Sequence, residues 1–137
     1  MAAVEVHTYL SRARDFLKGM DLLKDDLAEY GSPSALLGIH CAISYNDALR
    51  TGMGCADVSA EDHHRAARDL KTRLASRRFE KQQGADRLEK LLSKKNRISY
   101  ASDSAREDEI VGIVRHAERF AEWAEAAGRK LKIEGWK

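Results

Sequence analysis

The stretch SPSALLGIHCAISYNDALRTG, residues 32–52, decides the fold of this 137-residue chain. Apolar side chains recur on nearly every side of a helix drawn over it: Ala35, Leu36, Leu37, Ile39, Cys41, Ala42, Ile43, Ala48 and Leu49. A helix of this kind is usually enclosed by its neighbours. Ser32 suits the N-cap, and Pro33 suits the first helical position, where its missing N–H costs nothing. We therefore predict a central helix over residues 33–51, ended by Gly52-Met53-Gly54.

The segment before this helix has the pattern of an amphipathic helix over residues 4–30. Its apolar side chains follow spacings of three and four: Val6, Leu10, Ala13, Leu17, Met20, Leu23 and Leu27. Such a stripe buries one face and leaves the charged face in water. Gly31 can end this helix in the left-handed conformation.

Two further helices are predicted between residues 60 and 100. Ser59 followed by Asp62 forms a capping box for a helix over about 60–77. Gly84 marks the joint to the next helix. The inward positions are Ala66, Ala67, Leu70 and Leu74 in the first helix and Leu88, Leu91 and Leu92 in the second.

A last helix is predicted from the capping box of Ser104 and Glu107 to about Ala127, with Gly128 as its cap. Its buried stripe is Ile110, Val114, Ala117, Ala121 and Ala124, with Phe120 and Trp123 beside it. Short connections make sequential helices antiparallel. We predict one all-α domain over residues 1–137, an antiparallel up-and-down bundle of four to five helices. Trp136 packs on this bundle or on a second subunit.

The composition agrees with a single helical domain. Hydrophobic residues make up 43%, charged residues 34% and aromatic residues 7%, with one proline. These values argue against a collagen-like, disordered or disulfide-stapled chain. The longest apolar run, residues 35–43, contains His40 and is too short to cross a membrane. The N-terminus lacks the layout of a secretory signal, and Cys41 and Cys55 fit a reducing compartment, so we expect a cytoplasmic protein without a membrane partner.

The charges are segregated along the chain although the net charge is only +2. Counting Lys, Arg, Asp and Glu gives −5 for residues 1–64, +8 for residues 65–97 and −1 for residues 98–137. A basic block on an otherwise acidic chain indicates a polyanion or an acidic partner. The alternative is a solvated helix face that keeps the protein soluble.

We expect neither a metal nor a cofactor. Cys41, Cys55, His63 and His64 do not show the compact ligand pairs of structural zinc sites, and the two adjacent histidines point apart on a helix. No glycine-rich phosphate loop stands between a strand and a helix. We interpret the cysteines as small buried apolar residues.

A polar stripe interrupts the central helix. His40, Ser44 and Asp47 stand at positions i, i+4 and i+7 and share one face. A buried polar stripe needs hydrogen-bond partners or water. The stripe is either a polar groove for a ligand or another helix, or the solvent side of the helix; we favour the solvent side.

Three segments resemble the HEPN family: LLSKKNRISY at 91–100, ALLGIHCAISYNDAL at 35–49 and AERFAEW at 117–123. The resemblance covers roughly residues 32–126. It implies a short helical bundle, usually a homodimer, often encoded beside a minimal nucleotidyltransferase. Many members are metal-independent ribonucleases in toxin–antitoxin, CRISPR and RNA-surveillance systems. Their signature is an arginine, a polar residue and then a histidine after four to six intervening residues.

This chain departs from that signature at both catalytic positions. Lys95 replaces the arginine and Tyr100 replaces the histidine, while Asn96 matches the polar residue. Lysine lacks the planar fork of arginine, and tyrosine, with a pKa of about 10, is a poor proton shuttle at neutral pH. We therefore expect no catalytic residue. The expected binding residues for RNA, a nucleotide or a protein partner are Lys94, Lys95, Asn96, Arg97, Tyr100, Arg77, Arg78, His40 and Asp47, with Lys81 in the same basic block.

Two other functions fit the same residues. One is a metal-independent ribonuclease with a rearranged site of Lys95, Tyr100 and His40. The other is a protein-interaction module of antitoxin type, whose basic block docks on an acidic partner. Asn96 and Tyr100 also have a purely structural interpretation, as a helix-ending residue and a packed ring.

Overall fold

The computed structural model describes residues 2–58, 62–80, 82–100 and 107–137, with backbone alone at 96–100. Within these ranges the chain is helical and has no strand. The elements are α1 (Ala2–Leu23), the 3-10 helix η1 (Lys24–Asp26), α2 (Leu27–Gly52), α3 (His63–Ser76), α4 (Gln83–Tyr100) and α5 (Glu107–Lys130). The predicted all-α helical bundle is confirmed.

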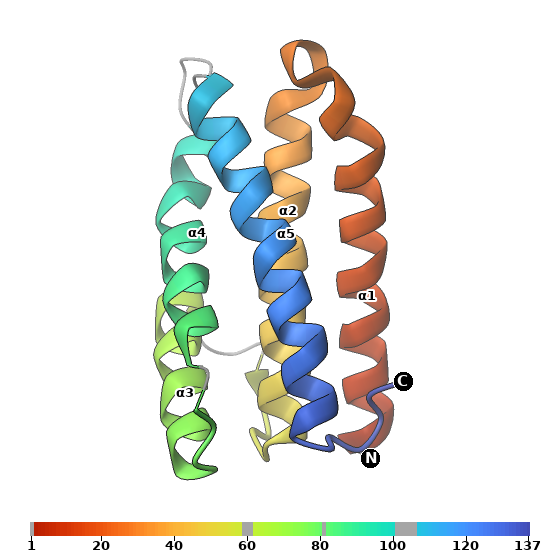
Figure 1. The fold of residues 1–137 in the computed structure, drawn as a ribbon, viewed down its shortest axis with the longest axis vertical. Coiled ribbons are helices and arrows are strands. Elements are labelled where there is room, and N and C mark those ends of the chain that lie inside the picture. Colours follow the sequence, from red (N-terminus) through yellow and green to blue (C-terminus); the bar gives the residue numbers. More distant parts are fainter. Residues whose placement is uncertain (1, 59–61, 81, 101–106) are drawn as a thin grey trace.

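Helix α2 is the central element of the bundle (Figure 1). It packs against α1, α5, α4 and α3, whereas α1 and α5 lie mostly apart and meet chiefly through long side chains such as Arg14 and Glu125. Ala35, Ile39 and Ala42 are among its fully or almost fully buried side chains. The prediction that its apolar surface is enclosed by neighbouring helices is therefore confirmed.

The chain reverses between α1 and α2 earlier than the sequence predicts. The turn is η1, and Asp26 is the N-cap of α2 because its carboxylate accepts a hydrogen bond from the N–H of Glu29 at 3.3 Å. Helix α2 is kinked at Tyr30, whose φ is −116° and ψ is 21°. Pro33 lacks the N–H that would bond to residue 29, and the kink accommodates that loss.

The predicted left-handed cap at Gly31 is wrong, as is the predicted N-cap at Ser32, which lies inside α2. Gly31 is buried in α2, and a Cβ there would lie 2.9 Å from Cδ1 of Ile110. Its missing side chain therefore permits close packing of α5. A glycine that permits close packing and a glycine that ends a helix look alike in sequence.

Helices α2 and α3 run in the same direction, which departs from simple up-and-down order. Arg50 near the end of α2 bonds to Asp69, and the carbonyl of Met53 bonds to Arg73, further along α3. Helix α3 therefore begins further back along the bundle than the end of α2, and its described residues run beside the last turns of α2 (Figure 1). The other sequential pairs are antiparallel, as predicted.

The C-terminal segment folds back onto the bundle. Helix α5 continues to Lys130, beyond the predicted end, and Gly128 is not its cap but a buried helical residue that leaves room for Trp136. The Trp136 ring stacks on Tyr45 with centroids 6.3 Å apart. Of the two interpretations of Trp136, the structure supports packing on its own bundle. Among the described helices, none combines the length and apolar content that a membrane crossing requires.

Candidate functional site

The residues predicted to bind a ligand lie in three places. Arg77 is the C-cap of α3 and Arg78 follows it with a φ of 56°. Lys94 and Lys95 lie in the later turns of α4, more than about 16 Å further along the bundle. His40 and Asp47 are on α2. The structure thus separates the two arginines from the two lysines.

For four predicted residues the structure describes no side chain. For Asn96, Arg97 and Tyr100 only the helical backbone is described, and Lys81 lies in a gap between described ranges. The Ser59 and Ser104 halves of the predicted capping boxes lie outside the described residues as well. At the first of these boxes Asp62 is the N-cap of α3, and its Oδ1 accepts from the N–H of Arg65 at 2.9 Å.

Lys94 and Lys95 face different parts of the molecule, since neighbouring residues on a helix are turned by about 100°. Lys95 acts electrostatically on His40 and His63. Burial first, and then the charge of Lys95, lower the pKa of both imidazoles below the ordinary value. Lys94 instead lines a cavity between α4 and α5. Only Lys95 therefore meets a histidine of the predicted site on α2.

The polar stripe of α2 is not a fully solvated face. Ser44 is buried, and the side chain of Asp47 is 18% exposed. The His40 ring packs against Phe16 with centroids 5.6 Å apart. Burial raises the pKa of Asp47 to about 7, although Arg50 and Arg12 lower it in part. The favoured interpretation of this stripe as the solvent side is wrong at Ser44 and Asp47.

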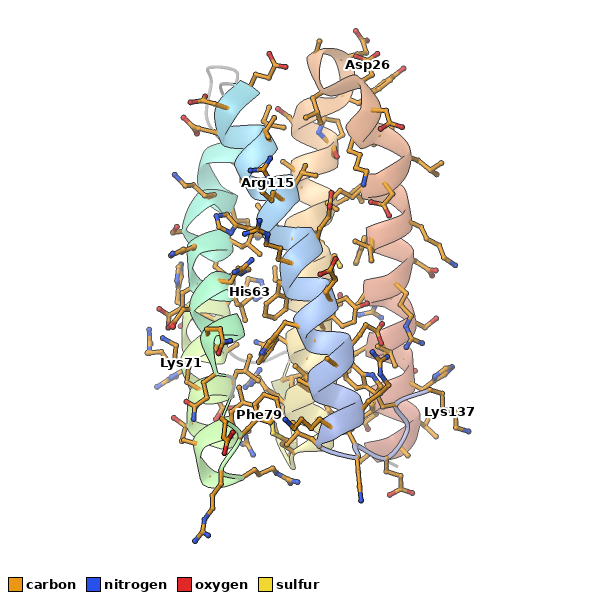
Figure 2. The ribbon with its side chains drawn as sticks, in the orientation of Figure 1. Asp26, His63, Lys71, Phe79, Arg115 and Lys137 are labelled. Atoms are coloured by element: carbon orange, nitrogen blue, oxygen red, sulfur yellow. The ribbon has the colours of Figure 1, made fainter. Side chains whose placement is uncertain are left out.

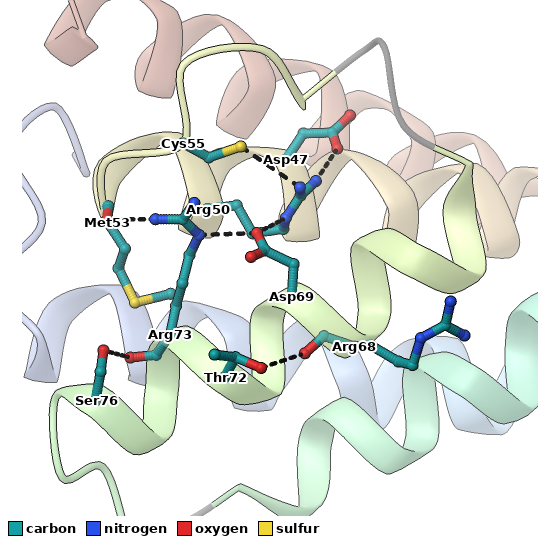
Figure 3. A network of polar contacts seen from close by, with 9 residues as sticks. All are labelled: Asp47, Arg50, Met53, Cys55, Arg68, Asp69, Thr72, Arg73 and Ser76. Carbon is teal, nitrogen blue, oxygen red and sulfur yellow. Dashed lines mark hydrogen bonds and ion pairs between the residues drawn. The ribbon is translucent and has the colours of Figure 1, made fainter.

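Arg50 is a fully buried arginine that the sequence analysis missed (Figure 3). Its Nε donates to Oδ2 of Asp69 at 2.8 Å, and its Nη2 donates to Sγ of Cys55 at 3.4 Å. Its Nη1 lies 3.9 Å from Oδ1 of Asp47. Arg73 extends the network, because its Nε donates to the same Asp69 oxygen and its Nη1 to the carbonyl of Met53. These bonds tie α2, α3 and the segment between them together.

A second missed network lies between α1 and α5. Arg14 donates from Nε and Nη2 to the two carboxylate oxygens of Glu125, and the Tyr45 hydroxyl donates to Oε2 at 2.7 Å. Burial and the bond to Glu125 raise the pKa of Tyr45. The adjoining cavity of about 420 Å³ is lined by both signs of charge: Arg14, Lys18, Lys24, Asp21, Glu118, Glu122 and Glu125, with Leu17, Tyr45 and Ala121. Its cations are matched by carboxylates, so it has no preference for one sign of charge.

The groove between α4 and α5 is also lined by both signs of charge, but the cations around its histidine, His116, form no ion pair with a described residue. It begins as a cavity of about 210 Å³ lined by Gln83, Asp86, Arg87, Lys90 and His116. It continues as a cavity of about 360 Å³ lined by Lys90, Leu91, Ser93, Lys94, Asp108, Glu109, Gly112, Ile113 and His116. Lys90 and His116 line both cavities, so we treat the two as one feature, the α4–α5 groove.

Four cations act on His116 at the centre of this groove. Burial lowers the pKa of His116, and the charges of Arg87, Lys90, Arg119 and Arg115 lower it further. Figure 2 shows Arg115 on the upper part of α5. Within the described part of the chain none of these four cations forms an ion pair. The carboxylates of Asp86 and Glu89 are instead held by Lys71 of α3.

Two polar atoms in the groove have no hydrogen-bond partner although both are buried. They are Nη1 of Arg87 and Nδ1 of His116. An unpartnered buried polar atom costs about 1–3 kcal/mol. Both side chains line the smaller cavity, so two hydrogen-bonding groups without a described partner lie beside it.

The sequence contains a signal for this groove. Arg87, Lys90 and Lys94 stand at i, i+3 and i+7, and Arg115 and Arg119 stand at i and i+4. The sequence analysis grouped the cations of residues 65–97 but left out the α5 pair, which lies in a segment of net negative charge. Only the antiparallel packing of α4 and α5 brings the two sets together.

The described residues hold no cluster of three or more His, Cys, Asp and Glu side chains suited to a metal. Cys41 and Cys55 are buried free thiols, and burial raises the pKa of Cys41 to about 12. Such a thiol is a poor nucleophile, because the thiolate is the reactive form. The interpretation of both cysteines as small buried residues agrees with these positions.

Comparison with models of protein families, with curated proteins and with solved structures found no match to this chain.

Proposed function

We propose that this chain is a HEPN-like protein that binds RNA along the α4–α5 groove and does not cleave it. The observation that carries the proposal is the set of cations around His116 without partner carboxylates. Cations gathered at one place repel each other and favour a bound polyanion. Lysine and arginine side chains in such a groove are the ordinary means of neutralising phosphates.

The shape of the groove favours a strand of phosphates over a folded acidic surface. From Gln83 to Lys94 the groove follows α4 for about 16 Å, at 1.5 Å per residue. Its α4 cations recur every three or four residues, which matches a ligand whose charges also recur at intervals. No described Phe, Tyr or Trp side chain lines it, so His116 is the only described ring there on which a base could stack. Binding is therefore expected to depend on phosphates and not on sequence.

We expect no cleavage in the groove because of where the residues of the predicted ribonuclease site lie. His40 and Lys95 are near each other, but Lys95 is turned away from the groove that Lys94 lines. Lysine also replaces the arginine that the HEPN signature places at this position. The proximity of His40, His63 and Lys95 favours a second candidate function, a ribonuclease with a rearranged site.

The proposal includes a homodimer and a cytoplasmic location, with a minimal nucleotidyltransferase as a possible protein partner. The HEPN resemblance supports the dimer and this partner. Two buried free thiols suit a reducing compartment. Size-exclusion chromatography with light scattering tests the dimer directly.

The proposal is tested by anisotropy of a fluorescein-labelled single-stranded RNA of about 12 nucleotides, in EDTA, across a salt series. The groove variant is Lys90→Gln/Arg119→Gln. The matched control is Arg77→Gln/Arg78→Gln, which removes the same charge at the other predicted cations. The groove variant is expected to weaken binding about tenfold and the control less than about threefold.

Equal weakening by both variants would show that net charge, and not the groove, drives binding. No binding of the wild type at low salt would overturn the proposal and favour a protein partner. Cleavage of the RNA in EDTA that disappears in His40→Ala would support the ribonuclease instead. Cleavage that survives His40→Ala would indicate a contaminating nuclease and not the His40 site.

A further inference from the structure

We infer that the smaller cavity of the α4–α5 groove is a subsite for the terminal phosphate of an RNA strand. The inference rests on the proposed function, because it concerns how the same groove receives RNA. The cavity has a volume of about 210 Å³ and is lined by Gln83, Asp86, Arg87, Lys90 and His116.

The first argument is the pair of open hydrogen-bonding positions. Nη1 of Arg87 and Nδ1 of His116 are both buried and without a partner, and both side chains line this cavity. A phosphate oxygen accepts from a guanidinium N–H and from an imidazole N–H. A phosphate in the cavity is therefore expected to bond to both groups once the two half-buried side chains rotate toward it.

The second argument is the balance of charge. Arg87 and Lys90 are not ion-paired, whereas the one carboxylate in the lining, Asp86, is bound by Nζ of Lys71. Figure 2 shows Lys71 on α3, on the outer side of α4. The repulsion between Asp86 and an entering anion is reduced by this ion pair. The cavity as a whole therefore favours an anion.

The third argument is that the groove ends here. One turn before Arg87, the indole of Trp123 occupies the space where a Cβ of Gly84 would be. Helices α4 and α5 are therefore in close contact at Gly84 and Trp123, and a strand cannot continue between them. In the other direction the groove runs on to Lys94. A strand that follows the groove up to this contact is therefore expected to place its end next to Arg87 and His116.

A terminal phosphate differs from an internal one in charge and in the number of free oxygens. A phosphomonoester carries close to two negative charges at neutral pH and has three acceptor oxygens. An internal phosphodiester carries one charge. The cavity is thus expected to discriminate phosphorylated from hydroxyl ends.

The test compares four labelled RNAs of one sequence by anisotropy: with a 5′-phosphate, with a 3′-phosphate, with both ends hydroxyl, and with both ends phosphorylated. We expect one phosphorylated end to raise wild-type affinity about tenfold over the hydroxyl RNA. In Arg87→Lys and His116→Gln the difference between these RNAs is expected to fall below about twofold, because affinity for the phosphorylated RNAs falls more than affinity for the hydroxyl RNA. Arg115→Lys, which keeps its charge outside the cavity lining, is the matched control and should retain the difference.

The outcomes separate this inference from the proposed function. Equal affinity of the wild type for all four RNAs would overturn the terminal-phosphate subsite while leaving RNA binding by the groove in place. No binding of any of them would overturn both. Discrimination that persists in Arg87→Lys and His116→Gln, with folding verified by circular dichroism, would place the subsite elsewhere. Half-burial of both side chains makes these variants compatible with the fold.

Discussion

Arg50 and Arg87 are both arginines with a buried guanidinium atom, but their surroundings have opposite charge. Arg50 lies between the carboxylates of Asp69 and Asp47, and its bonds join α2 to α3. Arg87 lies beside Lys90 and His116, and its buried Nη1 has no partner. A compensated buried charge holds elements of one chain together, whereas an uncompensated one remains available to a ligand. The comparison predicts that Arg50 contributes to the stability of the fold and that Arg87 contributes to ligand binding.

The largest expected effect of removing a cation is that of Arg50→Met on stability. The variant removes the buried cation between Asp69 and Asp47 and leaves Asp69 with Arg73 as its described partner. We therefore expect a loss of about 3 kcal/mol, near the lower end of the range of about 3–5 kcal/mol that is typical of a broken buried pair. Arg87→Met, the matched variant, is expected to cost less than about 1 kcal/mol, because it removes an unpartnered atom. Urea unfolding followed by circular dichroism measures both. Equal losses of unfolding free energy in the two variants would show that Arg50 stabilises the fold no more than Arg87 does.

A smaller effect is expected at the closed end of the groove. Gly84→Ala places a methyl group where the Trp123 indole lies, so we expect a loss of about 1–3 kcal/mol from overpacking. Gly112→Ala is the control on the opposite wall, since a Cβ there meets nothing within 4 Å. It is expected to stabilise α5 by about 0.5–1 kcal/mol through helix propensity. Thermal unfolding of both variants tests the close contact that ends the groove, and a neutral Gly84→Ala would contradict it.

The fold is the part of this molecule that the sequence predicts best. The apolar surface of residues 33–51 predicted a central helix covered by its neighbours. The apolar stripes of the other helices predicted which of their faces pack against it. The boundary near Gly31 was mispredicted, because the residue's role depends on Ile110 of a helix almost eighty positions later. Local patterns carry no information about such a distant neighbour.

The candidate site was predicted only in part. Lys94 lines the α4–α5 groove, whereas Lys95 acts on His40, and the pair Arg77 and Arg78 lies at the far end of α3. Arg115 and His116 were missed because charge counted along the chain does not show which helices meet. Arg50 was missed for a related reason: its partner Asp69 is on a helix that runs parallel to α2, which short connections do not predict.

The dependence of stability on pH tests how Asp47 interacts with Arg50. The pKa of Asp47 is raised to about 7 by burial, against an ordinary value of about 3.9 in the unfolded chain. Between these values the folded protein holds a proton that the unfolded chain releases, so this carboxyl makes stability fall as pH rises from about 4 to about 7. Asp47→Asn mimics the protonated form. We expect it to match the wild type near pH 4 and to exceed it by up to about 4 kcal/mol near pH 8, the free energy that corresponds to a difference of about three between the two pKa values.

The measurement for Asp47→Asn is urea unfolding at several pH values. A variant that is less stable than the wild type at pH 8 would show that the charged form of Asp47 is needed beside Arg50. That result would show that ionised Asp47 stabilises the fold as a partner of Arg50, as Asp69 does.

The smallest expected effect is on the salt dependence of RNA binding. Lys90→Gln removes one phosphate contact, so the slope of log affinity against log salt concentration is expected to fall by about 0.7 for a single strand. Lys18→Gln, on the charge-matched wall between α1 and α5, is expected to leave the slope unchanged. An equal change of this slope in both variants would show that RNA does not prefer the α4–α5 groove to the cavity between α1 and α5.

The return of α5 to α1 has a consequence for the order in which the chain folds. The contact between Arg14 and Glu125 joins residues 111 positions apart, and that between Tyr45 and Glu125 joins residues 80 apart. Closing such long loops is slow compared with forming the α1–α2 and α3–α4 hairpins. Docking of the C-terminal half of α5 is thus expected late on the folding pathway. Arg14→Met should then accelerate unfolding and leave the folding rate almost unchanged in stopped-flow kinetics.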